Sequence, residues 1–183
     1  MASIITATTT SGLTQSADNS GVLQLASGTG NLVTIPSVTG TAMVSGNMPA
    51  FSAWASLNTT LSNATLTKVN FQTEEYDTNN NFASSRFTPT VAGYYLITAS
   101  LAWSTGTFPS AICLYKNGSR FKDGVFVLSN STTGSVTTLS AQLYLNGSTD
   151  YVEIYGYQAS GGNSDANATS TGTFFQGVLV RAA

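Results

Sequence analysis

One stretch, residues 87–103, constrains the fold more than any other part of the chain, because it is a long strand-like run introduced by turn residues. Pro89 and Gly93 precede its apolar part, and residues of this kind bound strands. In a period-2 pattern one face is wholly apolar and the other is half apolar, as in a central strand covered on both sides. The aromatic and β-branched content favours a strand over a buried helix. We therefore predict a central β-strand whose core-facing residues include Tyr95, Ile97, Leu101 and Trp103.

Short strand-like runs separated by turn signals fill residues 50–183. Asn117-Gly118 and Asn146-Gly147 each join two such runs, and Asn-Gly is the strongest short signal for a hairpin because both positions tolerate positive φ. Glu74–Asn81 and Gln158–Gly172 are interpreted as polar connections, and no helical periodicity occurs. The pattern predicts an all-β fold, an antiparallel jelly-roll sandwich.

Residues 1–47 differ from the rest of the chain because they are polar and rich in Ser and Thr. Two short strand-like runs, Val22–Leu25 and Leu32–Ile35, lie on either side of a Ser/Gly turn. A two-stranded unit is marginal alone in water, so this part should need a partner. We predict a β-rich arm, residues 1–47, that anchors or oligomerises the chain, and a head, residues 48–183. A disordered leader is the alternative.

Composition and charge exclude several classes of partner. Only 8% of residues are charged, and six basic against eight acidic side chains give a net charge of −2. No basic patch for nucleic acid is therefore expected. Apolar runs never approach the roughly 20 residues that span a bilayer, so no membrane insertion is expected. Residues 1–10 lack the pattern of a signal peptide.

Catalytic and metal sites are not expected either. The chain has no histidine, which removes Ser-His-Asp and Cys-His sites and His-ligated zinc. The single cysteine, Cys113, lies in an apolar run and is interpreted as a buried hydrophobe. Glu74, Glu75 and Asp77 form an acidic cluster, but adjacent residues of an extended segment point to opposite sides, so a solvated loop is favoured over a glycosidase site. We predict no catalytic residue, no cofactor and no metal.

The order of several motifs between residues 49 and 183 resembles that of a known family. These motifs are Pro49-Ala50-Phe51-Ser52-Ala53, Phe71 before Tyr76-Asp77, Phe82, Phe87 to Tyr95, Leu114-Tyr115-Lys116-Asn117-Gly118, and Phe175-Gln176-Gly177-Val178-Leu179-Val180. Together they resemble the globular head of complement C1q and the tumour-necrosis-factor-like (TNF-like) jelly rolls. The resemblance implies a jelly roll that forms homotrimers around a threefold axis. Some members bind calcium near that axis, but no matching set of carboxylates can be placed here.

A candidate subunit interface lies on the strand expected at residues 151–157. Tyr151, Tyr155 and Tyr157 fall on its outer face, which is too aromatic for open water. We predict these three tyrosines at a trimer interface. Packing beneath a loop explains them equally well.

The arm resembles the leaders of phage fibre and virion proteins, through Ser16 to Leu25 and Gly30 to Ile35. The resulting prediction is a non-enzymatic, trimeric structural protein of a bacteriophage virion, assembled in the host cytoplasm. The arm, residues 1–47, would bind other virion proteins and the head would face outward. Two roles stay open, a tail-fibre head that attaches to host-surface glycans and a capsid decoration protein. A soluble C1q-like carbohydrate-binding lectin of a cell, then extracellular, is the alternative.

Overall fold

The computed structural model describes residues 23–26, 32–35, 46, 48–128, 132 and 134–183, and it divides the chain into two compact units, Met1–Ala42 and Met43–Ala183. In the first unit β1 (Leu23–Ala26) and β2 (Leu32–Ile35) pair antiparallel. These are the two short strands predicted for the arm, the first slightly shifted along the chain. The boundary predicted between residues 47 and 48 falls inside the second unit.

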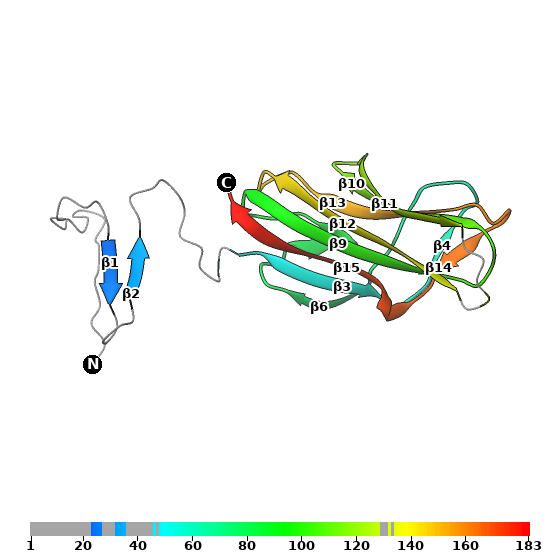
Figure 1. Ribbon diagram of the computed structural model, residues 1–183, viewed down its shortest axis with the longest axis horizontal. Helices are drawn as coiled ribbons and strands as arrows, with labels where there is room; N and C mark the ends of the chain where they lie inside the picture. The colour runs from blue at the N-terminus through cyan, green and yellow to red at the C-terminus, as the bar shows by residue number, and fades with distance from the viewer. Residues whose placement is uncertain (1–22, 27–31, 36–45, 47, 129–131, 133) are drawn as a thin grey trace. The chain divides into compact units, whose positions relative to one another are not determined.

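The second unit consists of two antiparallel β-sheets (Figure 1). The six-stranded sheet has the order β11-β10-β13-β8-β7, with β5 also on β13. Its strands are β5 (Thr67–Lys68), β7 (Phe82–Ala83), β8 (Arg86–Phe87), β10 (Pro109–Lys116), β11 (Ser119–Leu128) and β13 (Val152–Gln158).

The seven-stranded sheet has the order β4-β14-β9-β15-β3-β6, with β12 also on β9. Its strands are β3 (Ala50–Ala55), β4 (Thr59–Leu61), β6 (Thr73–Asp77), β9 (Gly93–Trp103), β12 (Ser135–Leu145), β14 (Ser164–Ala166) and β15 (Thr169–Ala182). The predicted antiparallel all-β jelly roll is confirmed.

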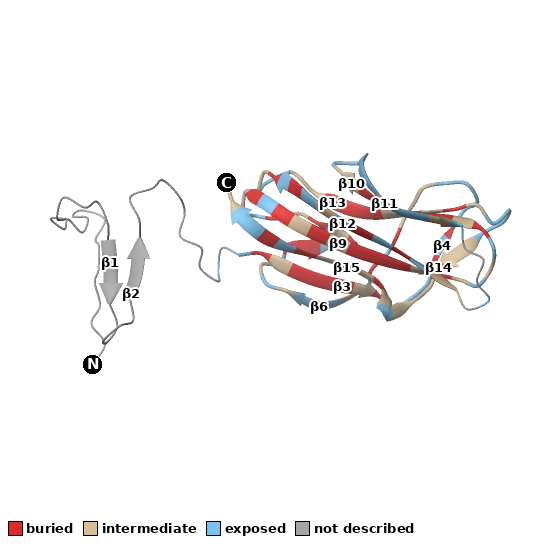
Figure 2. Ribbon diagram, viewed as in Figure 1, coloured by how far each residue is buried: buried red, intermediate tan, exposed pale blue. Residues whose placement is uncertain are grey.

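Strand β9 is the central strand of the seven-stranded sheet. Along its whole length it pairs with β12, from Gly93 opposite Leu145 to Trp103 opposite Ser135, and its other edge pairs with β15. Buried and more exposed residues alternate along it, as Figure 2 shows. This alternation places every second side chain between the two sheets.

The core lies between the two sheets and is rich in aromatic rings. Tyr95, Ile97, Leu101 and Trp103 all lie in it, each at most 1% exposed. The Phe51 ring stacks on Phe87 with centroids 4.3 Å apart, and the remaining rings of this cluster are Phe71, Phe82 and Phe175. Burial of so many large rings accounts for much of the apolar area removed from water.

Two segments interpreted as polar connections contain strands instead. Thr73–Asp77 forms β6 on the edge of β3, and Ser164–Ala166 forms β14 between β4 and β9. Neither has a strand-like apolar alternation. Their backbone groups pair with strands already in place, so tertiary context overrides the weak local propensity.

Candidate interaction surface on the seven-stranded sheet

The outward face of the seven-stranded sheet carries no charged side chain along most of its three longest strands. The outward positions of β9 begin with Tyr94 and Leu96, which the register places beside the outward residues of β12 and β15. Those positions are Tyr94, Leu96, Thr98, Ser100 and Ala102 on β9, Val136, Thr138, Ser140, Gln142 and Tyr144 on β12, and Phe174, Gln176 and Val178 on β15. A face without charged side chains is less strongly hydrated than a charged one, so its burial costs less desolvation free energy.

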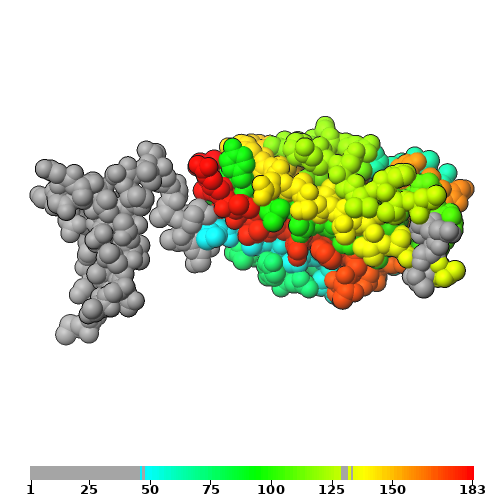
Figure 3. All heavy atoms as spheres, viewed as in Figure 1, coloured from blue at the N-terminus to red at the C-terminus, as the bar shows by residue number. Residues whose placement is uncertain are grey.

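Large apolar and aromatic side chains stand exposed on this face. Tyr94 is 50% exposed and Val180, at the end of β15, is 55% exposed. The further exposed members are Tyr76, Val136, Tyr144 and Val178. Figure 3 shows parts of β12 (yellow), β15 (red) and β3 (cyan) at this surface. Tyr94, Tyr144, Val178 and Val180 lie toward one end of the face, and exposed aromatic and apolar side chains gathered in this way are typical of an interaction site.

The exposed rings are fixed by neighbours on adjacent strands. Tyr94 lies directly opposite Tyr144 in the ladder, and their rings meet edge to face with centroids 5.6 Å apart. Leu96 lies between Gln142 on one side and Val178 on the other. Such cross-strand pairs hold side chains in place before a partner binds, which lowers the entropy lost on association.

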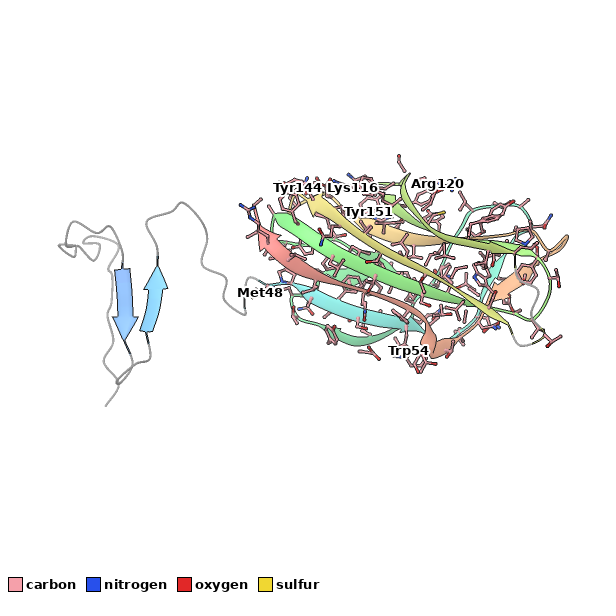
Figure 4. All side chains as sticks on the ribbon, in the orientation of Figure 1. Met48, Trp54, Lys116, Arg120, Tyr144 and Tyr151 are labelled. Carbon is pink, nitrogen blue, oxygen red and sulfur yellow. The ribbon has the colours of Figure 1, made fainter. Side chains whose placement is uncertain are left out.

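Charges appear on this face only near its borders. Arg181 lies near the end of β15, opposite Tyr94, and Glu75 lies on the edge strand β6. Glu75 Oε2 accepts a hydrogen bond from Ser52 Oγ at 2.7 Å. Trp54 and Tyr144 belong to the same face and are labelled on β3 and β12 in Figure 4. A face with few charges and several aromatic side chains has the composition usual at the centre of a protein–protein interface.

A second exposed apolar surface lies on β11, the edge strand of the other sheet. Phe126 is 64% exposed and Leu128 is 68% exposed, with Phe121 and Val125 also exposed. The pairing of β10 with β11 shifts register between Ala111 and Cys113, where Ile112 of β10 faces the part of β11 that contains Gly124. Around Gly124 the edge of β11 lies against β12, so the exposed apolar side chains of this strand, and not its backbone edge, form the second candidate surface.

The three tyrosines predicted at a trimer interface lie on or beside β13, in the six-stranded sheet, and all are half-buried within one chain. The Arg86 guanidinium lies 3.8 Å from the centre of the Tyr151 ring. Tyr155 stacks on Tyr115 with centroids 3.8 Å apart, and Tyr157 lines a hollow of about 320 Å³. These contacts show how the rings are held in one chain, and their role at an interface stays a prediction.

The contacts of Asp77, from the acidic cluster, and of Cys113 are those of residues that support the fold. Asp77 Oδ2 accepts a hydrogen bond from the Phe82 backbone N–H at 2.7 Å, which shapes the turn after β6. Cys113 is buried, and burial raises the pKa of its thiol to about 11. Across the described residues no group of three or more His, Cys, Asp or Glu side chains could hold a metal ion. The same residues contain no helix long and apolar enough to cross a membrane.

The sequence of β9 contains a signal for the seven-stranded sheet's outward face. The half-apolar second face of residues 94–102 indicates a strand covered on both sides, whereas within one chain Tyr94 on the outward face of β9 stays exposed. Pairing of Tyr94 with Tyr144 and of Leu96 with Val178 depends on the register of three strands. That register could not be read from local patterns.

Comparison of the sequence with models of protein families and with curated proteins finds no match. Solved structures do match in fold. The globular domain of zebrafish complement 1qA is 21% identical, with a TM-score of 0.52 over 74% of this chain and 98% of that chain. Murine APRIL is 13% identical, with a TM-score of 0.55 over 73% and 99%. Eiger TNF from S. frugiperda is 13% identical, with a TM-score of 0.52 over 74% and 93%. The head therefore has the jelly-roll fold of C1q globular domains and TNF-like proteins.

Proposed function

We propose that the chain is a non-enzymatic structural protein whose head assembles into a homotrimer through the outward face of the seven-stranded sheet. The observation that carries the proposal is the exposed aromatic and apolar surface at one end of that face, from Tyr94 and Tyr144 to Val178. Exposure of this surface to water is unfavourable. Other copies of the same chain can cover this surface, because they are present wherever the chain is made.

Two unlike apolar surfaces on one chain support a ring of copies. The sheet face and the edge strand β11 differ in shape and residues, so contact between one and the other is heterologous, and heterologous contacts close into rings when the rotation allows. The resemblance to C1q and TNF-like heads supplies the expected number of subunits, three. Absence of histidine from the chain supports the non-enzymatic part of the proposal.

The proposed trimer is further placed on a phage particle. This placement is supported by the sequence of the arm, residues 1–47, with its short strands β1 and β2 and its resemblance to leaders of virion proteins. The arm would bind another virion protein and the head would contact host-surface glycans or cover the capsid. The copy number per particle separates these roles, since hundreds of copies indicate capsid decoration and a few to a few dozen indicate a fibre.

A matched pair of variants tests the trimer. Sedimentation of the full chain should give about three times the chain mass of 19.0 kDa. Val178→Asp places a charge beside Leu96 on the sheet face and should give a folded monomer. Leu57→Asp, at a 67% exposed position in the loop after β3, should stay trimeric. A monomeric parent chain, or a trimeric Val178→Asp variant, would contradict the proposal.

A third variant addresses the tyrosines of the six-stranded sheet. Tyr155→Ser removes a ring of the predicted tyrosine interface and leaves the seven-stranded sheet unchanged. If Tyr155→Ser is a folded monomer while Val178→Asp stays trimeric, the subunits meet through the tyrosines. The proposal expects the reverse.

A cellular C1q-like lectin is the second candidate function, favoured by the fold alone. The two candidates differ in whether purified particles of a phage contain the chain. Detection of the chain in virions by mass spectrometry would support the first candidate, and its recovery only from cell supernatant would support the second.

A further inference from the structure

A polar cavity of about 450 Å³ lies beside the edge of the six-stranded sheet, away from the outward face of the seven-stranded sheet. It is lined by Lys68, Asn80, Asn81, Ala83, Ser84, Arg86, Thr88 and Thr90. Every lining residue except Ala83 has a polar side chain. The volume is within the range of small-molecule sites.

The cavity has an excess of positive charge. Lys68 Nζ and Arg86 Nε both donate to Glu153 Oε1, at 2.7 and 2.9 Å. Two cations therefore stand against one carboxylate, in a chain that has only six basic residues and a net charge of −2. Asp77, the nearest acidic residue in sequence to the turn at residues 78–82, does not line the cavity. The excess charge favours an anionic ligand.

The two cations are held in place from the protein side. Glu153 is only 3% exposed, and the Arg86 guanidinium also lies over the Tyr151 ring. Lys68 Nζ donates a further hydrogen bond to the Ser84 carbonyl at 2.9 Å. Across the described residues the Nη atoms of Arg86 make no hydrogen bond that would occupy them. A pre-positioned guanidinium with free Nη groups can bind a carboxylate with two parallel hydrogen bonds.

Uncommitted hydrogen-bonding side chains surround these cations. Within the described part of the chain the side chains of Asn80, Ser84 and Thr88 make no hydrogen bond, whereas Asn81 is fully engaged with Asn79 and Thr90. Hydroxyl and amide groups that lack an internal partner suit the hydroxyls of a sugar.

The backbone around the cavity is held in an unfavourable conformation. Ser84 and Ser85 form the two-residue loop between β7 and β8 with φ of 51° and 56°, a conformation that favours Asn-Gly. Ser85 Oγ accepts from the Phe71 N–H at 2.8 Å, which helps to hold this turn. Asn80 also has a positive φ of 52°. Such conformations gather at ligand sites, where the surrounding structure maintains them.

We infer that this cavity binds an acidic saccharide, a pyranose ring that carries a carboxylate, with Arg86 and Lys68 on the carboxylate and Ser84, Thr88 and Asn80 on the hydroxyls. The inference deepens the proposed role in host attachment and rests on that role for its biological use. No residue of the seven-stranded sheet's outward face lines the cavity. Ligand binding can therefore be tested independently of trimer formation.

Calorimetric titration of the full chain with methyl glucuronide tests the inference. The acidic sugar should bind at least about tenfold more tightly than methyl glucoside or sodium sulfate, since only it engages both the cations and the hydroxyl-bearing side chains. Arg86→Gln should weaken binding at least about tenfold. Arg120→Gln, which removes a cation paired with Asp123 elsewhere on the surface (Figure 4), should leave binding unchanged.

Two further variants keep the inference testable if Arg86→Gln unfolds. Lys68→Gln removes the second cation and leaves the Arg86–Glu153 pair in place, so it should weaken binding of the glucuronide at least about tenfold. Thr88→Val removes one hydroxyl and should weaken the glucuronide about threefold or more while sulfate is unaffected. Equal binding of sulfate and glucuronide, no binding of glucuronide, or equal affinity in Arg86→Gln and Arg120→Gln would overturn the inference.

Sedimentation of the same samples separates this result from the proposed function. A trimer that does not bind the glucuronide contradicts the ligand site alone. A monomer that binds it contradicts the trimer alone.

Discussion

Trp103 Nε1 donates a hydrogen bond to Thr137 Oγ1 at 2.9 Å, and both side chains are fully buried. The bond joins inward-facing side chains of β9 and β12 inside the core. The outward-facing side chains of the same two strands belong to the candidate interface. The indole N–H thus has the partner that burial requires. This bond makes the register of the two strands specific, because a shift by one residue would turn Thr137 to the outside.

Replacement of Trp103 is expected to be severe. Trp103→Ala removes the largest fully buried side chain and should lower the free energy of unfolding by about 3–5 kcal/mol. Thr137→Val keeps the volume but leaves the indole N–H without its partner, at a cost of about 1–3 kcal/mol. Urea unfolding followed by circular dichroism measures both. A Trp103→Ala protein with an unchanged midpoint would contradict the core described here.

Gly124 is expected to tolerate no side chain. A Cβ at this position would lie 2.5 Å from the Thr138 carbonyl oxygen and 2.8 Å from Leu139 Cβ, where β11 closes over β12. Gly124→Ala should therefore destabilise the head by about 1–3 kcal/mol, because the nearest atom belongs to the backbone and cannot move aside. Gly162→Ala is the control, since nothing lies within 4 Å of its added Cβ. Equal melting temperatures of the two variants would refute the close contact.

Acid should weaken the head partly through Glu153. Burial by itself would raise the pKa of this carboxyl, but hydrogen bonds and charge from Lys68 and Arg86 outweigh burial and leave the pKa below its usual value. A pKa lowered by folding gives stability that is present above the unfolded-state value and is lost as the pH falls through the folded-state value. The free energy of unfolding should thus fall as the pH decreases below about 4.

Comparison with Glu153→Gln isolates this contribution from Asp123 and Asp150, whose pKa values are also lowered by neighbouring groups. The variant should lose stability at neutral pH, where the ion pairs are broken, and should show a smaller further loss in acid. Thermal melts across the pH range measure both curves. Parallel curves for the two proteins would show that Glu153 does not contribute to the acid response.

The arm and the head are expected to have separate tasks. Deletion of Met1–Gly46 leaves the strands of both sheets, β3 to β15, intact, so the truncated chain should remain soluble and folded. If the proposed attachment of the arm to a phage particle is right, the truncated chain should no longer join that particle. Quantification of the truncated chain in purified particles measures this, and full occupancy without the arm would place attachment on the head.

The sequence by itself determined the fold class and much of the core. Alternation along residues 93–103, two Asn-Gly turns and the absence of helical periodicity are local signals, and local signals are enough to define strands and hairpins. The position of Trp103 among core residues followed from the same alternation.

Only the tertiary structure decided which outward faces stay uncovered. The apolar face that joins Tyr94, Tyr144 and Val178 exists because β12, β9 and β15 are neighbours in one register, although these strands are distant in sequence. The cation pair of Lys68 and Arg86 likewise depends on β5 and β8 both pairing with β13, where Glu153 lies between them. Non-local pairing is fixed by the packing of the whole head, so no local pattern in the chain contains it.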